Sequence, residues 1–306
     1  WLARTPTAMP RTACTPMTVR RWILNTTGNN LHSGMDFYNI RIWETEEVTE
    51  TSVRFKLHSP DGDQGYPGTA DIYVTYSLDK DDKLDIFYEA LSDKDTILNM
   101  TNHSYFNLDG HNSGSVLQHT LTLEADYFTP GDAQSIPTGE ILPVENTPMD
   151  FREGRKIGER IEEEYEPLRF GNGYDHNWVL KNKGNFEKVA ELMAEESGIV
   201  METYTDRPGM QIYTANFVEN EVGKEGVVYG KRSAVCLETQ CYPDAVHHEN
   251  FPSPVYRAGE KYTSTGISSV NAAAAKKNGK TYNMAGQEVS SSAKGLIIKN
   301  GKKYVK

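Results

Sequence analysis

Apolar and polar residues alternate along much of the chain. Residues 71–78 and 83–91 each place an apolar side chain at every second position, and the four polar residues 79–82 between them have turn-forming character. A period of two is typical of a strand with one buried face. The pattern therefore predicts a β-hairpin over residues 71–91.

Similar strand-like segments recur through the chain and are separated by turns that contain glycine and proline. Many short strands joined by turns favour antiparallel sheets over parallel βαβ units. We therefore expect an all-β protein. The further predicted strands are 51–57, 118–128, 174–180, 199–205, 211–217 and 234–238.

Few segments have helical character. Residues 156–166 are polar on most faces, which predicts a short solvated helix. Residues 186–196 have a helix-forming composition but lie between two strand-like segments, so helix and strand both remain open for them.

Charge is distributed unevenly along the 306 residues. The chain has 32 basic and 43 acidic side chains, a net charge of −11, yet residues 1–35 contain four arginines and no acid, and residues 271–306 contain eight lysines and one glutamate. The middle of the chain is therefore strongly acidic and repels phosphate groups, so we expect no nucleic-acid partner. No apolar run reaches the roughly 18 residues that a membrane span needs, so we expect none.

Metal and disulfide chemistry find little support. The three cysteines, Cys14, Cys236 and Cys241, form neither a disulfide framework nor a zinc motif. An oxygen-rich Ca²⁺ site is conceivable among the many acids, although no EF-hand spacing occurs. His247 and His248 lie near acids, but adjacent histidines point to different sides of an extended strand. We expect no metal there and no cofactor.

Four polar segments are candidates for a site: residues 99–108, 173–178, 237–245 and 258–262. They combine histidine, carboxylate and amide side chains with tyrosine and tryptophan. Neutral polar groups beside aromatic rings suit a sugar, whose hydroxyls need donors and acceptors and whose C–H faces stack on rings.

The run NMTNHSYFNL at residues 99–108 resembles the signature of the aldose 1-epimerase (galactose mutarotase) family. Five further segments are similar to family motifs in the same order along the chain. This resemblance implies a galactose mutarotase-like antiparallel β-supersandwich, with the site in an open groove on one sheet. The further segments are LHSG at 31–34, SPDG and GYPG at 59–68, YDHN at 174–177, LETQ at 237–240 and GE-x-Y at 259–262.

The resemblance also implies roles for individual residues. Anomerisation needs a base for the C1 hydroxyl proton and an acid for the ring oxygen. The resemblance gives Glu260 as the base and His103 as the acid. From the ordinary pKa values of about 4.3 and 6.5, and from the acidic surroundings that favour imidazolium, we expect Glu260 ionised and His103 protonated. The resemblance gives the hydroxyl-binding residues as His32, Tyr105, Asp175 and Gln240.

The two ends of the chain depart from the family. A G-R-x-A-N-R-I segment should precede the LHSG motif, but residues 1–24 contain nothing similar, so we interpret them as an aberrant or divergent start. Residues 25–270 then form the epimerase domain. Residues 271–306 form a linker and a lysine-rich tail, which either resembles the C-terminal tails of exported Bacteroidota proteins or is a disordered basic extension. A cytoplasmic and an exported location both stay open.

The resemblance predicts an isomerase that interconverts the α and β anomers of a free aldohexose such as galactose or glucose, and we expect a monomer. Two alternatives remain. A non-catalytic carbohydrate-binding module can use the same fold. A glycoside hydrolase would need two carboxylates flanking the bond, which Glu260 and Asp175 would have to supply, leaving His103 without a clear task.

Overall fold

In the computed structural model, the described residues are 2–3, 29–272, 281–283, 288–290, 296–299 and 302–305. Cys14 and most of the aberrant start, together with much of the tail, lie outside them. Antiparallel strands dominate, which confirms the all-β fold class. No helix in this part of the chain is long and apolar enough to cross a membrane.

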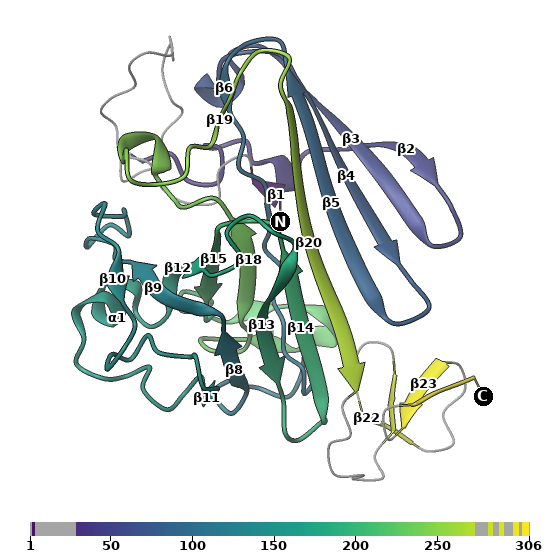
Figure 1. Ribbon diagram of the computed structural model, residues 1–306. Coiled ribbons are helices and arrows are strands. Elements are labelled where there is room, and N and C mark those ends of the chain that lie inside the picture. Colours follow the sequence, from purple (N-terminus) through teal and green to yellow (C-terminus); the bar gives the residue numbers. More distant parts are fainter. Residues whose placement is uncertain are drawn as a thin grey trace.

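The largest sheet has nine strands and forms the long side of the molecule in Figure 1. Its strands, in spatial order, are β11 (Arg155–Lys156), β8 (Thr120–Leu123), β13 (Glu187–Met193), β14 (Ile199–Thr205), β20 (Lys261–Ala272), β5 (Lys83–Ser92), β4 (Ala70–Leu78), β3 (Ser52–Ser59) and β2 (Glu44–Val48).

A five-stranded sheet packs against the β8, β13 and β14 part of the large sheet. Its strands, in spatial order, are β10 (Leu142–Pro143), β9 (Ala125–Thr129), β12 (Asp175–Leu180), β15 (Gly209–Tyr213) and β18 (Cys236–Gln240). The core between the two sheets is apolar: Trp178, Ile212 and Leu237 face Leu121 and Leu192 in one buried cluster. Burial of this surface stabilises the sandwich by roughly 25 cal/mol for each Å² removed from water.

A second core covers the other half of the large sheet. Ile72 and Val74 of β4 and Tyr88 of β5 pack with Tyr38 and Met100, which the connecting segments place over them. Tyr262, on β20, is fully buried and its hydroxyl accepts a hydrogen bond from the Met100 amide at 3.0 Å. This contact fixes the chain immediately before the NHSYFN segment.

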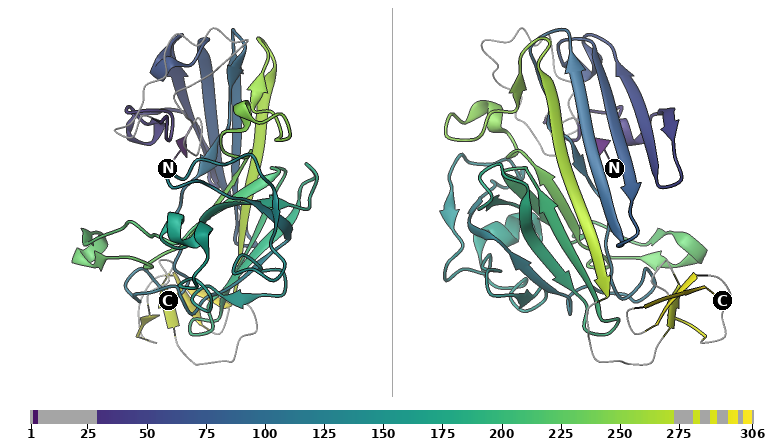
Figure 2. Two further views of the ribbon diagram at one scale, coloured as in Figure 1. Left: turned by 90° about the vertical axis from the view of Figure 1, so that its left-hand side faces the viewer. Right: turned by 45° about the vertical axis from the view of Figure 1, so that its right-hand side comes forward.

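Shorter elements complete the fold. Three two-stranded pairs are β1 (Leu2–Ala3) with β7 (Thr101–Asn102), β16 (Glu221–Val222) with β17 (Val228–Tyr229), and β19 (Val255–Tyr256) with β6 (Thr96–Ile97). The helices are α1 (Glu166–Gly171) and the 3-10 turns η1 (Tyr38–Ile40), η2 (Asp63–Gly65), η3 (Lys224–Gly226) and η4 (Ala245–His247). Figure 2 shows the β16–β17 hairpin, in green, projecting from the body.

The tail strands pair with one another. The order is β22 (Glu288–Val289), β21 (Thr281–Asn283), β23 (Leu296–Lys299) and β24 (Lys302–Val305). This small sheet lies beyond the end of β20 in Figure 1.

Most strand predictions are confirmed, with three differences. The predicted 118–128 strand is two strands, β8 and β9, which belong to different sheets because the chain crosses between the layers at Glu124. The ambiguous 186–196 segment is strand β13. The helix predicted over 156–166 is wrong: the chain there forms β11 and turns, and α1 begins only at Glu166, where Pro167 suits the first helical turn.

Candidate active site

One face of the five-stranded sheet is polar. Since side chains alternate along a strand, residues two apart share a face. Trp178 and Ile212 point into the apolar core, so their strand neighbours point the opposite way. The polar face carries Asp175 and Asn177 on β12, Gln211 and Tyr213 on β15, and Cys236, Glu238 and Gln240 on β18.

At the centre of this face, an imidazole meets a carboxylate. Nε2 of His103 lies 3.4 Å from Oε1 of Glu238. Glu238 is 2% exposed and His103 is 8% exposed. The chain brings His103 there because β7, which ends one residue earlier, lies against β18.

Burial shifts the pKa values of Glu238 and His103 in opposite directions. Burial is the main cause that raises the pKa of Glu238 well above its ordinary value, and the neighbouring charge of Asp175 raises it further. Burial lowers the pKa of His103 to about 4. Burial therefore favours the form in which the carboxyl group holds the proton and the imidazole is neutral.

Beside this pair, a chain of side-chain hydrogen bonds joins strands β12, β15 and β18. Gln211 donates from Nε2 to Oδ1 of Asp175 at 2.8 Å, and Gln240 donates from Nε2 to Gln211 and Asn177, both at 3.2 Å. Burial raises the pKa of Asp175 to about 6. Oε1 of Gln240 is buried and accepts no hydrogen bond from the described residues. It is thus an acceptor available to a ligand hydroxyl.

Aromatic rings surround His103. The ring centroids of His32, Tyr105 and Tyr213 lie 5.5, 5.1 and 5.8 Å from that of His103. Burial lowers the pKa of His32 to about 3, which keeps this second imidazole neutral. The His32 loop reverses direction through left-handed backbone at Ser33, with φ of 79°, a conformation that glycine adopts at lower cost.

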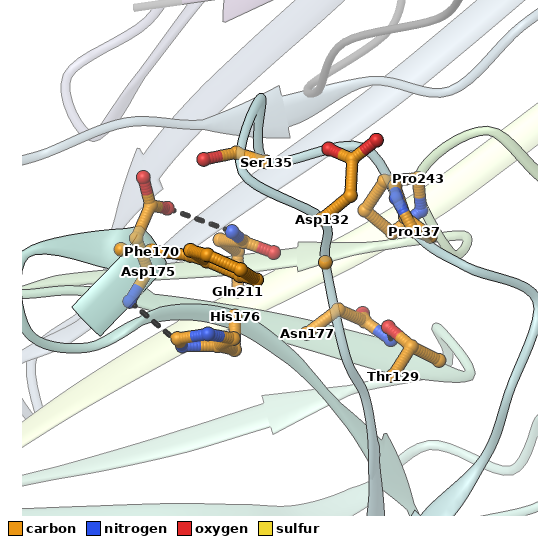
Figure 3. A pocket seen from close by; sticks show the side chains of 12 residues that line it. Thr129, Asp132, Ser135, Pro137, Phe170, Asp175, His176, Asn177, Gln211 and Pro243 are labelled. Atoms are coloured by element: carbon orange, nitrogen blue, oxygen red, sulfur yellow. Dashed lines mark hydrogen bonds between the residues drawn. The ribbon is translucent and has the colours of Figure 1, made fainter. Parts of the chain in front are cut away.

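A small hollow flanks the sheet beside Asp175 (Figure 3). Thr129, Asn177 and Gln211 line it, and its volume is about 20 Å³. That space suits a water molecule and is far too small for a sugar. The hollow therefore lies in the wall of the site and does not hold the sugar.

The structure brings together five of the six residues predicted for the site: His32, His103, Tyr105, Asp175 and Gln240. His103 and Gln240 are buried, His32 and Asp175 are partly buried, and Tyr105 is exposed. Glu260 is the exception. It lies in an exposed turn before β20, where its carboxylate accepts a hydrogen bond from the Arg257 amide at 2.9 Å. The carboxylate that lies beside His103 in the structure is that of Glu238.

Sequence reasoning also missed Gln211, which connects Asp175 to Gln240. A signal for Glu238 was present: a carboxylate that directly follows the apolar run 234–237 in a predicted strand is expensive to bury and needs a reason. Gln211 follows the turn at 207–209 in a strand whose other residues are apolar or small, which is a similar signal.

His103, Cys236 and Glu238 have potential metal-ligand atoms within 4.8 Å of one another, and no other such group of three occurs in the described ranges. Burial raises the pKa of the Cys236 thiol well above its ordinary value and so disfavours the thiolate form that ligates metals.

His247 and His248 differ from the expectation for an extended strand. Because η4 curls the chain, both imidazoles approach the buried Asp244: Nδ1 of His247 bonds its carboxylate, and Nε2 of His248 lies 3.5 Å from it. Nε2 of His248 also lies 3.2 Å from the Pro137 carbonyl oxygen, so this cluster ties two loops together.

Comparison with known proteins identifies the relatives of this chain. The family model described as aldose 1-epimerase matches residues 19–269. Galactose mutarotase of Sus scrofa is 41% identical over 243 residues, which are 79% of this chain and 69% of the relative. Aldose 1-epimerase of Haemophilus influenzae is 38% identical over 238 residues, covering 76% of this chain and 68% of the relative.

Solved structures agree with the sequence matches. A GalM/aldose epimerase homologue from C. elegans superposes with a TM-score of 0.79 at 28% identity, over 88% of this chain and 81% of that chain. Galactose 1-epimerase from Lactobacillus acidophilus has the same fold, with a TM-score of 0.75 over 88% and 78% of the two chains at 24% identity. This chain belongs to the aldose 1-epimerase family.

Proposed function

We propose that this chain is an aldose 1-epimerase, an isomerase that interconverts the α and β anomers of a free aldohexose such as galactose or glucose. The observation that carries the proposal is the contact between His103 and Glu238 on the polar sheet face. A carboxyl group and an imidazole that share one proton are what the reaction requires, because it removes a proton from one oxygen and adds a proton to another.

We assign the base to Glu238 in place of Glu260. In the productive complex, the Glu238 carboxylate takes the proton of the C1 hydroxyl, and His103 donates a proton to the ring oxygen. The C1–O5 bond breaks and C1 becomes a carbonyl carbon. After rotation about C1–C2, the ring closes on the other face of the carbonyl and both protons return. No oxidation state changes.

The working ion pair and the resting neutral pair carry the same single proton. Burial favours the neutral pair, whereas the attraction between carboxylate and imidazolium across 3.4 Å favours the ion pair. Substrate hydroxyls that hydrogen-bond to the carboxylate stabilise its charged form further. Binding of the sugar therefore shifts the proton from Glu238 to His103.

The surrounding residues bind hydroxyls. Asp175 and Gln211 form a fixed acceptor and donor pair, and Gln240 presents its unpartnered oxygen. Tyr105 and His32 border the imidazole and offer ring faces to the C–H groups of a sugar. Every residue of the cluster comes from one chain, so we propose that the monomer is active, which light scattering coupled to gel filtration tests.

We propose that the reaction needs no cofactor, since the pair supplies both proton transfers. Dialysis against EDTA should leave the rate unchanged. A lost rate that Zn²⁺ or Ca²⁺ restores would contradict this.

The direct test is polarimetry. Purified protein should accelerate the change in rotation of freshly dissolved α-glucose or α-galactose above the spontaneous rate. Hydrolysis of nitrophenyl glycosides without mutarotation would instead indicate a glycoside hydrolase, and sugar binding without either activity would indicate a carbohydrate-binding module.

A further inference from the structure

A second, larger groove adjoins the site. It lies between the β16–β17 hairpin and the segment that follows His103, and its volume is about 750 Å³. The residues that matter here are Tyr105, His111, Phe217, Glu221, Lys224 and Tyr229. This volume is within the range of small-ligand sites, which is roughly 300 to 1,000 Å³.

The groove and the catalytic cluster share the Tyr105 ring as a wall. Tyr105 lines the groove and its ring lies 5.1 Å from that of His103. The Tyr213 ring contacts the rings of both His103 and Tyr105, with its centroid 6.2 Å from that of Tyr105. It also stacks on the Phe217 ring, with the centroids 6.4 Å apart and an interplanar angle of 17°. The Phe217 amide donates to the Tyr213 hydroxyl at 3.1 Å. A row of aromatic rings therefore runs from the imidazole into the groove.

These rings are exposed in a way that a sugar would explain. Phe217 is 60% exposed and Tyr105 is 42% exposed, and neither is needed to fill a core. On the hairpin wall, the Tyr229 hydroxyl hydrogen-bonds to Nδ1 of His111 at 2.9 Å, which holds the Tyr229 ring in place. Exposed and rigidly held rings suit the C–H faces of pyranose units.

The charges in the groove favour a neutral ligand. The lining residues include one carboxylate, Glu221, and one ammonium group, Lys224, whose charges are opposite. A phosphorylated sugar would be recognised by several cations, which this groove does not have among its lining residues. Hydroxyl groups can pair with both side chains.

We propose that the groove binds the glycosyl units beyond the reducing-end hexose of a linear oligosaccharide of three or more units. The reducing-end hexose then lies beside the His103–Glu238 pair, and the next units stack on Tyr105, Phe217 and Tyr229. This inference rests on the proposed function, because it assumes that the anomeric carbon lies at that pair.

The test compares glucose with maltotriose and cellotriose, with rates taken from magnetisation exchange between anomeric protons. In the wild type, KM for at least one trisaccharide should be several-fold below that for glucose. Phe217→Ala and, separately, Tyr229→Ala should raise the trisaccharide KM at least fivefold and change the glucose KM less than twofold, because the lost contacts bind only the distal units.

Phe186→Ala is the matched control, since Phe186 is 47% exposed and stacks on Tyr204 at 6.1 Å outside the groove. It should change neither KM. Equal wild-type KM values for glucose and both trisaccharides, or an equal effect of Phe217→Ala on all three sugars, would overturn the groove proposal while leaving the epimerase intact. Absence of glucose mutarotation in the wild type would instead refute the proposed function itself.

Discussion

Nε2 of His103 lies 3.4 Å from Oε1 of Glu238, and the two residues come from different motifs of the chain. This contact is the reason for proposing Glu238, of the LETQ segment, as the base in place of Glu260, of the GE-x-Y segment. Glu238 is buried beside the imidazole, whereas Glu260 is exposed and bonded to the turn that contains it. The base must reach the C1 hydroxyl while the acid reaches the neighbouring ring oxygen, and we propose Glu238 because it lies on the same polar face as His103.

The first prediction compares Glu238→Gln with Glu260→Gln. Loss of the base should lower kcat for mutarotation by about 10² to 10⁴-fold, the usual contribution of a positioned proton-transfer group. Glu260→Gln should retain at least half of the wild-type rate. Polarimetry at saturating galactose measures both, and thermal melts check that each variant is folded. A large loss in Glu260→Gln alone would return the base to that residue.

The second prediction concerns pH. The pair works while it holds one proton. Below about pH 4, the pair binds a second proton, so both groups are protonated and no base remains. Above the raised pKa of Glu238, the pair has lost its proton and no acid remains. We therefore expect kcat/KM to fall at both ends of the pH range, with the acidic limb near 4.

Asp175→Asn tests the cause of the alkaline limb. The charge of Asp175 helps to raise the pKa of Glu238, so its removal should lower that pKa and move the alkaline limb to lower pH. The residual activity is normalised to its own maximum, and the spontaneous rate is subtracted at each pH because water and buffer also catalyse mutarotation. An alkaline limb that stays in place would show that this carboxylate does not act on Glu238.

The third prediction concerns stability and His176. Its ring is buried on the core side of β12: Nδ1 accepts a hydrogen bond from the Asp175 amide at 3.1 Å, and Nε2 lies 3.1 Å from the Pro167 carbonyl. Burial lowers the pKa of His176 from 6.5 to about 4. Between these values the unfolded chain binds a proton that the folded chain does not, so acid favours unfolding.

The stabilisation from neutral His176 is thus fully present above pH 6.5 and is lost as pH falls toward 4, by about 3 kcal/mol. His176→Gln cannot titrate and should be less stable at pH 7 but show a shallower decline over this interval. Urea unfolding at closely spaced pH values measures both slopes. Parallel curves for the two proteins would contradict the assignment.

The sequence predicts those elements of the fold that its local pattern determines. It does not predict those that depend on pairing between distant strands. The hairpin of β4 and β5 follows from alternation alone, because each apolar position faces one core. The division of residues 118–128 between two sheets at Glu124 is not visible in the pattern, since both strands are apolar on one side. Likewise, α1 depends on a local start at Pro167 and not on composition.

The same distinction explains the site. His103 and Asp175 belong to segments with several polar groups, so the sequence alone marks them. The choice of Glu238 over Glu260 requires knowing that β18 lies beside β7 and that Glu238 shares a face with Gln211. Pairing between distant strands sets that geometry, which cannot be predicted from the order of the motifs along the chain.

The last prediction concerns Gly209, which opens β15 on the polar face. A Cβ there would lie 2.3 Å from Oδ1 of Asn177 and 2.9 Å from Cδ1 of Tyr242. That same Asn177 oxygen accepts the hydrogen bond from Gln240. Gly209→Ala should therefore push Asn177 aside, destabilise the protein by about 1 to 3 kcal/mol through overpacking, and disturb Gln240, the amide that we propose binds a sugar hydroxyl.

The functional consequence is a higher KM for the hexose, with a smaller effect on kcat, because the proton-transfer pair keeps its geometry while a binding group moves. Gly230→Ala is the control, since a Cβ at Gly230 meets no atom within 4 Å. Polarimetry over a range of galactose concentrations separates the two constants. If Gly209→Ala and Gly230→Ala gave the same KM, the amides between β12 and β18 would not be part of the sugar site, and hydroxyl binding would have to rest on Asp175 and the aromatic rings.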